Sequence, residues 1–122
     1  LARNSNVIVV DVGRDVQISL QMMAQALRSG GNLLIFPEGT RSPDGRLGDF
    51  KTTFAALAKE VQVPVIPVAI NGAHQALARG TRLPRLGTRV TVRFLPPISP
   101  ENFDTHQLTE TTRTAIAQNL LI

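Results

Sequence analysis

The sequence predicts an α/β fold, a layered α/β/α domain in which helices cover both faces of a mixed, mostly parallel sheet. Short apolar runs typical of buried strands alternate with stretches whose apolar residues recur every three or four positions, as in amphipathic helices. A late segment alternates apolar and polar residues, which is typical of a half-exposed strand. No repeat or linker divides the 122 residues, so we expect one domain, 1–122.

The first half of the chain is predicted to hold two buried strands and the helix between them. Four β-branched residues at 7–10 form the first strand, and 11–15 turn the chain. Apolar residues spaced four, three and four apart make 16–27 a helix, and the segment 29–31, Ser-Gly-Gly, suits a left-handed C-cap. The second buried strand is 32–36.

The next two predicted elements are a helix and a strand that contains prolines. Helical spacing at 50–61 predicts the helix, with Asp49 as its N-cap. The strand at 63–70 contains Pro64 and Pro67, which cannot donate to a sheet ladder. We therefore expect this strand at a sheet edge, or bulged.

The last two predicted elements are the alternating strand at 88–95 and a C-terminal helix. Apolar residues share one face over 108–120, and Asp104 and Gln107 have the spacing of a capping box. His106 falls in the first turn of this helix among polar neighbours, so we expect it to be exposed to solvent.

Composition excludes several classes of site. The chain has no cysteine, which excludes a disulfide framework, thiol catalysis and cysteine metal sites. It has no tryptophan or tyrosine and five phenylalanines, so the core is expected to be aliphatic. No apolar run approaches the length of a membrane span, so we expect any membrane contact of this segment to be peripheral.

Positive charge is concentrated in one stretch of the chain. It carries five arginines and no acidic residue, namely Arg79, Arg82, Arg85, Arg89 and Arg93. The other charges almost cancel, so this stretch accounts for the whole net charge of +4. It is suited to anionic lipid headgroups, an acidic substrate or nucleic acid. The alternative is a solvated loop and an edge strand whose arginines prevent pairing between sheets.

The residues 36–42, Phe-Pro-Glu-Gly-Thr-Arg-Ser, follow the second predicted strand and have the chemistry of a phosphate site. Arg41 offers a planar fork of donors to an oxyanion, and Thr40 and Ser42 add hydroxyl donors. Gly39 allows the backbone to approach a ligand closely. The alternative is an ordinary exit from a strand with a surface ion pair.

Three charged residues around this stretch extend the hypothesis. Glu38 would repel an anion, so we expect it to fix Arg41 or to accept a hydrogen bond from a ligand hydroxyl. Arg14 lies at a predicted turn between strand and helix, where phosphate contacts are common. Lys51, in the predicted first turn of the helix at 50–61, is unfavourable for the helix dipole unless an anion lies nearby.

Residues 36–42 resemble the FPEGTRS block of the glycerolipid acyltransferases, the family of 1-acylglycerol-3-phosphate acyltransferases and their relatives. Seven consecutive residues of mixed chemistry are more specific than a spaced glycine pattern. Residues 11–15, the pair Phe50-Lys51 and the proline-containing run 63–70 are also similar to blocks of that family. The resemblance covers residues 6–97.

The chain departs from the family at its catalytic block, His-x4-Asp. The only histidines, His74 and His106, are followed at the fifth position by Arg79 and Thr111. The resemblance therefore implies a C-terminal, N-terminally incomplete part of an acyltransferase domain, with the general base on an absent portion. We assign no catalytic residue and expect this part alone to be inactive; a surrogate base at His74 is the less favoured alternative.

The resemblance also implies a function in phospholipid biosynthesis or remodelling. In the reaction that the resemblance implies, an acyl group moves from acyl-CoA or acyl carrier protein to a hydroxyl of a glycerophosphate or lysophospholipid, and we expect no metal or cofactor and a location at the cytoplasmic face of a membrane. The residues expected to bind the acceptor are Arg14, Glu38, Gly39, Thr40, Arg41, Ser42 and Lys51. The alternatives are a phospholipid- or anion-binding module without catalysis and, disfavoured by the lack of tryptophan and tyrosine, a nucleic-acid binder.

Overall fold

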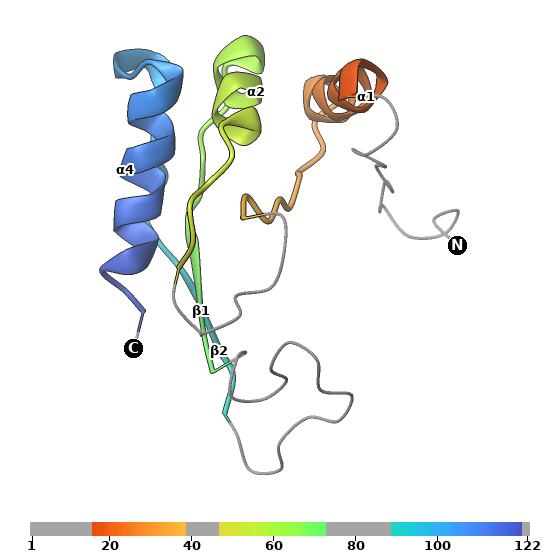
Figure 1. Ribbon diagram of the computed structural model, residues 1–122. Helices are drawn as coiled ribbons and strands as arrows, with labels where there is room; N and C mark the ends of the chain where they lie inside the picture. The colour runs from red at the N-terminus through yellow and green to blue at the C-terminus, as the bar shows by residue number, and fades with distance from the viewer. Residues whose placement is uncertain (1–15, 39–46, 73–88, 121–122) are drawn as a thin grey trace. The chain divides into compact units, whose positions relative to one another are not determined.

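The computed structural model describes residues 16–38, 47–72 and 89–120, which Figure 1 draws in colour. The chain divides into two compact units, residues 1–34 and 35–122. Each unit is described by itself below. The strand predicted at 7–10 and the turn at 11–15 lie outside the described residues.

The first unit contains the helix α1, Val16–Arg28, which confirms the helix predicted at 16–27. The helix ends in a Schellman motif: the N–H of Gly31 donates to the carbonyl of Ala26, and that of Gly30 donates to Leu27, both at 3.0 Å. Gly30 has a φ of +90°, a conformation that is costly for a residue with a Cβ atom. The predicted left-handed end of the helix is therefore confirmed.

The second unit begins its regular structure with α2, Thr53–Val61, three residues later than predicted. Thr52 occupies the N-cap position, so the prediction of Asp49 as the N-cap is wrong. The N–H of Ala56 donates to the carbonyl of Thr52 at 3.0 Å, whereas the N–H of Lys51 donates across the loop to the carbonyl of Pro37 at 2.9 Å, so Lys51 belongs to the loop before the helix.

The sheet of the second unit has two antiparallel strands, β1 (Val68–Asn71) and β2 (Thr91–Phe94), within the described residues. Ala69 faces Arg93 and Ile70 faces Val92 in the register. The predicted strand at 63–70 is thus divided into a short strand and an isolated antiparallel bridge.

Backbone hydrogen bonds explain how the proline-containing segment fits this sheet. Pro67 lacks an N–H but accepts from the N–H of Leu95 at 2.9 Å. Val65 and Ile98 exchange two further hydrogen bonds, which form the isolated bridge. Each proline therefore lies where the ladder needs no donor from it.

The C-terminal helix α4, Thr105–Ala117, follows a short 3-10 helix, η1 (Pro100–Asn102). The predicted capping box is confirmed: the Gln107 N–H donates to Oδ1 of Asp104 at 2.7 Å, and the Asp104 N–H donates to Oε1 of Gln107 at 2.9 Å. His106 is exposed, as predicted.

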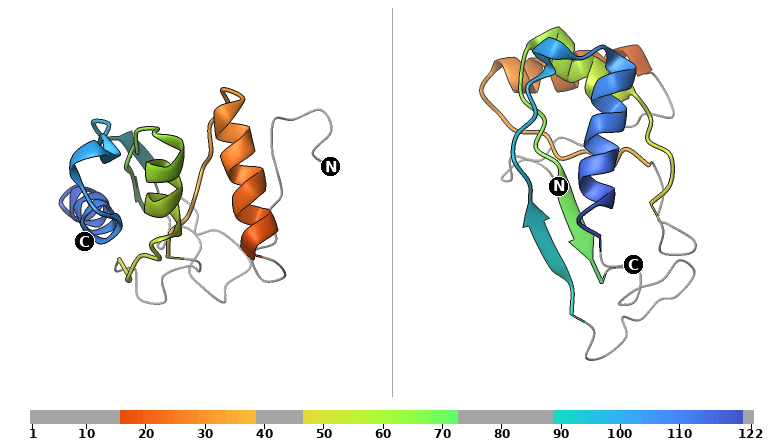
Figure 2. Two further views of the ribbon diagram at one scale, coloured as in Figure 1. Left: turned by 90° about the horizontal axis from the view of Figure 1, so that it is seen from above. Right: turned by 90° about the vertical axis from the view of Figure 1, so that its left-hand side faces the viewer.

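The core of the second unit lies between α2 and α4, with α4 also beside β1 (Figure 2). Four fully or nearly fully buried side chains form its centre, namely Phe54, Ala55, Ala58 and Leu108. Phe50 and Phe54 are in edge-to-face contact, with ring centroids 6.3 Å apart. Apolar packing therefore fixes α4 against α2.

The strand predicted at 32–36 is not present in the described structure, and the prediction of burial there is wrong. Leu34 and Phe36 are 75% and 67% exposed. A strand needs a hydrogen-bonding neighbour, and none pairs with 32–36 among the described residues.

The two-stranded sheet is also more exposed than predicted. The alternation at 88–95 yields a shorter strand, β2, and all four of its residues are exposed. On the side that carries Ile70, both Val92 and Phe94 remain exposed to solvent, at 55% and 73%. The mixture of helices and strands is observed, whereas the mostly parallel layered sheet stays a prediction.

Candidate functional site

Glu38 is the predicted site residue whose contacts the structure describes most fully. Its Oε2 accepts a hydrogen bond from the N–H of Gly48, with a donor–acceptor distance of 2.7 Å. A Cβ atom on residue 48 would lie 3.0 Å from that oxygen. Glycine at position 48 therefore allows the carboxylate to approach the backbone this closely.

A second contact beside it connects Pro37 with Lys51. The N–H of Lys51 donates to the carbonyl of Pro37 at 2.9 Å. We call this hydrogen bond and the one between Gly48 and Glu38 the loop-closing contacts. They join the residues on either side of the segment 39–46, which contains most of the predicted phosphate site.

Arg113 on α4 holds the returning end of this loop. Its Nε donates to the carbonyl of Gly48 and its Nη2 donates to the carbonyl of Leu47, both at 2.9 Å. The arginine is half-buried and lies 65 residues from Gly48 in sequence. The forked guanidinium suits two neighbouring acceptors.

The structure describes only part of the predicted set of acceptor-binding residues, and their role in binding the acceptor stays a prediction. Residues 39–42 and Arg14 lie outside the described residues, as does His74. Glu38 has a backbone partner that the sequence did not predict. The side chain of Lys51 is exposed and precedes α2, so placing it in the first turn of a helix is wrong. The contribution of Lys51 to the loop comes from its backbone N–H.

Gly48 and Arg113 are the two residues that sequence reasoning missed. Arg113 is the only lysine or arginine after Arg93, on a helix whose other residues are largely threonine and small apolar side chains. This separation of Arg113 from the other basic residues was the one signal in the sequence that could have marked it as a candidate. Its partner could not be inferred, because pattern arguments along one helix say nothing about contacts with a loop far away in sequence.

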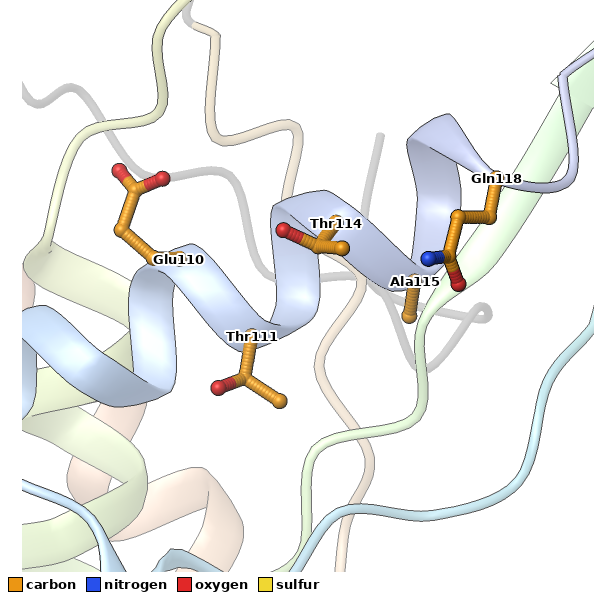
Figure 3. Close-up of a pocket in the computed structure, with 5 residues that line it drawn as sticks. All are labelled: Glu110, Thr111, Thr114, Ala115 and Gln118. Carbon is orange, nitrogen blue, oxygen red and sulfur yellow. The ribbon is translucent and has the colours of Figure 1, made fainter.

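The surface depressions that the structure shows on α1 and α4 contain none of the predicted site residues. A shallow depression on α4 is lined by Glu110, Thr111, Thr114, Ala115 and Gln118, which Figure 3 shows spread along the helix and pointing in different directions. In the described ranges, no group of three or more His, Asp or Glu side chains is placed to hold a metal ion. No helix there is long and apolar enough to cross a membrane.

The basic stretch is described only at its end. Arg89 and Arg93 are both exposed, and Arg93 lies on β2 opposite Ala69. Arg79, Arg82 and Arg85 lie outside the described residues. The interpretation of the stretch as a contact for an anionic surface therefore stays a prediction.

Comparison with known proteins supports the resemblance noted from residues 36–42. Residues 1–71 match the acyltransferase family. The chain is 39% identical over 89 residues to a 1-acyl-sn-glycerol-3-phosphate acyltransferase of Limnanthes alba, covering 70% of this chain and 31% of that protein. It is 33% identical over 97 residues to a probable 1-acyl-sn-glycerol-3-phosphate acyltransferase of Mycoplasma pneumoniae, covering 75% and 36%.

A solved structure agrees with this match. The crystal structure of the 1-acyl-sn-glycerophosphate acyltransferase PlsC from Thermotoga maritima superposes with a TM-score of 0.73 at 28% identity. The match covers 82% of this chain and 42% of that one. The chain thus spans about a third of the length of the curated relatives named above and less than half of the solved structure.

Proposed function

Because the chain belongs to the acyltransferase family, we propose that it is part of an enzyme that acylates a hydroxyl of 1-acylglycerol 3-phosphate or a related lysophospholipid. Within that enzyme, this part supplies the site for the acceptor's phosphate and glycerol. The observation that carries the proposal is the hydrogen bond from the N–H of Gly48 to the carboxylate of Glu38, a residue of the stretch 36–42.

The chemistry of the loop suits a phosphomonoester. Arg41 supplies a forked cation for the phosphate oxygens, and Thr40, Ser42 and the backbone of Gly39 supply neutral donors. Arg14 and Lys51 add positive charge. Their work is to position the acceptor, which lowers the barrier by holding the hydroxyl close to the thioester carbonyl.

The transfer step itself needs a general base, and we assign none to this chain. The acceptor's hydroxyl oxygen forms a bond to the thioester carbonyl carbon, the hydroxyl proton passes to the base, and the thiolate of the donor leaves. The donor is acyl-CoA or acyl carrier protein. We place the base in a His-x4-Asp block on another part of the enzyme, so the chain alone is expected to be inactive.

The same proposal covers the fold and the location of the enzyme. The chain is the C-terminal part of one layered α/β/α domain with a mostly parallel sheet, which the TM-score of 0.73 to a relative about twice as long supports. The enzyme works at the cytoplasmic face of a membrane, where this part makes peripheral contact. The exposed Arg89 and Arg93 support contact with anionic headgroups.

The experiment that tests the proposal replaces Arg41 with alanine in the full-length enzyme. Arg41→Ala should raise the KM for 1-acylglycerol 3-phosphate by about tenfold or more, because a charge-assisted hydrogen bond contributes about 1.5–3 kcal/mol. The KM for the acyl donor should stay within about twofold, since that substrate makes no contact with the arginine in this proposal.

Two results would contradict the proposal. An unchanged acceptor KM would remove Arg41 from the phosphate site. Binding of lysophospholipid by the full-length protein without any acyl transfer would instead favour the alternative, a phospholipid- or anion-binding module without catalysis.

A further inference from the structure

The peptide unit between Leu47 and Gly48 is held from both sides by charged groups. Its carbonyl oxygen, on Leu47, accepts from Nη2 of Arg113 at 2.9 Å. Its N–H, on Gly48, donates to Oε2 of Glu38 at 2.7 Å. A trans peptide is planar with its C=O and N–H pointing in opposite directions, so the unit forms a bridge between the two side chains.

The guanidinium fixes the orientation of this bridge as well as its position. Besides the carbonyl of Leu47, it binds the next carbonyl, that of Gly48, through Nε at 2.9 Å. Two parallel hydrogen bonds from a rigid fork allow little rotation of the backbone between their acceptors. A cation on the C=O side also polarises the peptide, which strengthens the donation of its N–H to the carboxylate.

The helix that carries Arg113 is itself fixed in place. Leu108 is fully buried in the core formed with Phe54 of α2, and Thr112, next to Arg113, is buried with its hydroxyl bonded to the carbonyl of Leu108. The capping box fixes the start of the helix. Because this packing fixes α4, it also fixes the backbone of Arg113, whose guanidinium then holds the two loop carbonyls in place.

We propose that Arg113 is a positioning residue for the Glu38 carboxylate and, through it, for the acceptor. By holding the carbonyls of Leu47 and Gly48, it fixes the N–H from which Glu38 accepts, and thereby the orientation of that carboxylate. It acts through Gly48 and Glu38 and makes no contact with the acceptor itself. This inference rests on the proposed function, because the consequence for the acceptor requires Glu38 to belong to the acceptor's site.

Lysine and glutamine at position 113 distinguish the fork from the charge. Arg113→Lys keeps the positive charge and the helix propensity but has a single ammonium in place of the two guanidinium nitrogens. Arg113→Gln keeps much of the apolar stem and removes the charge. Glu110→Gln, an exposed change on the same helix, is the matched control.

The first readout is amide hydrogen exchange at Gly48 in the full-length enzyme. Arg113→Gln should accelerate exchange of the Gly48 N–H by about tenfold, the equivalent of one hydrogen bond of about 1.4 kcal/mol, and Arg113→Lys by less. Glu110→Gln should leave it unchanged. Unchanged exchange in both Arg113 variants would overturn the positioning role, whatever their activity.

The second readout separates positioning from a merely structural role. Arg113→Gln should raise the KM for 1-acylglycerol 3-phosphate by about five- to twentyfold and leave the KM for the acyl donor within about twofold, with partial recovery in Arg113→Lys. An equal rise of both KM values together with a lower melting temperature would overturn the proposal, as would a normal acceptor KM beside faster Gly48 exchange.

The exchange readout also keeps the two proposals apart. Suppose that the wild-type enzyme transfers no acyl group and that Arg41→Ala binds lysophospholipid normally. The proposed function then fails, and with it the role of Arg113 for the acceptor. Exchange at Gly48 would still decide whether Arg113 positions Glu38.

Discussion

The core between α2 and α4 and the loop-closing contacts lie in the same unit but are held by different forces. The core is apolar, with Ala55 and Leu108 fully buried. The loop is held by single hydrogen bonds to backbone groups, largely at exposed positions. Burial of apolar side chains contributes most of the stability, whereas isolated exposed hydrogen bonds contribute little. The comparison predicts that stability and acceptor binding can be changed separately.

The largest effect on stability is expected in the core. Leu108→Ala should lower the free energy of unfolding by about 2–5 kcal/mol, because it leaves a cavity where a fully buried side chain packs against Phe54. Chemical denaturation of the full-length protein measures this change. The exposed Glu110→Ala on the same helix should stay within about 0.5 kcal/mol. Similar losses in the two variants would show that α4 does not depend on this core.

An intermediate effect is expected at the start of α4. Asp104→Ala removes the acceptor for the Gln107 N–H and should cost about 1 kcal/mol. Asp49→Ala is the matched control, because Asp49 does not cap α2 and its loss should cost less than about 0.5 kcal/mol. Thermal melting compares the two directly. A larger loss from Asp49→Ala would restore it as a structural cap.

The smallest effect on stability is expected at the loop. There, a substitution should affect acceptor binding more than it affects stability. Glu38→Ala removes an exposed acceptor and should lower the free energy of unfolding by less than about 1 kcal/mol. The acceptor KM should rise about tenfold, as for loss of a positioned group. Glu101→Ala, also exposed, is the control. If Glu38→Ala lowered the free energy of unfolding as much as Leu108→Ala, the loop would contribute to stability as the core does, and the comparison would be wrong.

Local signals in the sequence predicted the helices well. The apolar spacing and the Ser-Gly-Gly end predicted α1 and its C-cap, and Asp104 with Gln107 predicted the capping box of α4. Each of these features depends on residues within one or two turns of the helix. Such short-range chemistry can be inferred from neighbours in the chain.

Features that depend on distant partners could not be predicted in this way. The start of α2 was misplaced because Phe50 continues the apolar spacing of the helix but packs against the core from the preceding loop. The strand predicted at 32–36 depended on a neighbour, and the described residues there are largely exposed. Of the site, residue types pointed to Glu38, while Arg113 required the fold.

The loop-closing contacts also bear on how this protein can change during evolution. They hold the two ends of the segment 39–46 at a fixed separation, with Arg113 supporting the returning end. Surface loops whose ends are fixed tolerate insertions and substitutions between those ends. Substitutions at 43–46 are therefore expected to leave α2 and α4 undisturbed, whereas a side chain at position 48 would require the carboxylate of Glu38 to move by a few tenths of an ångström.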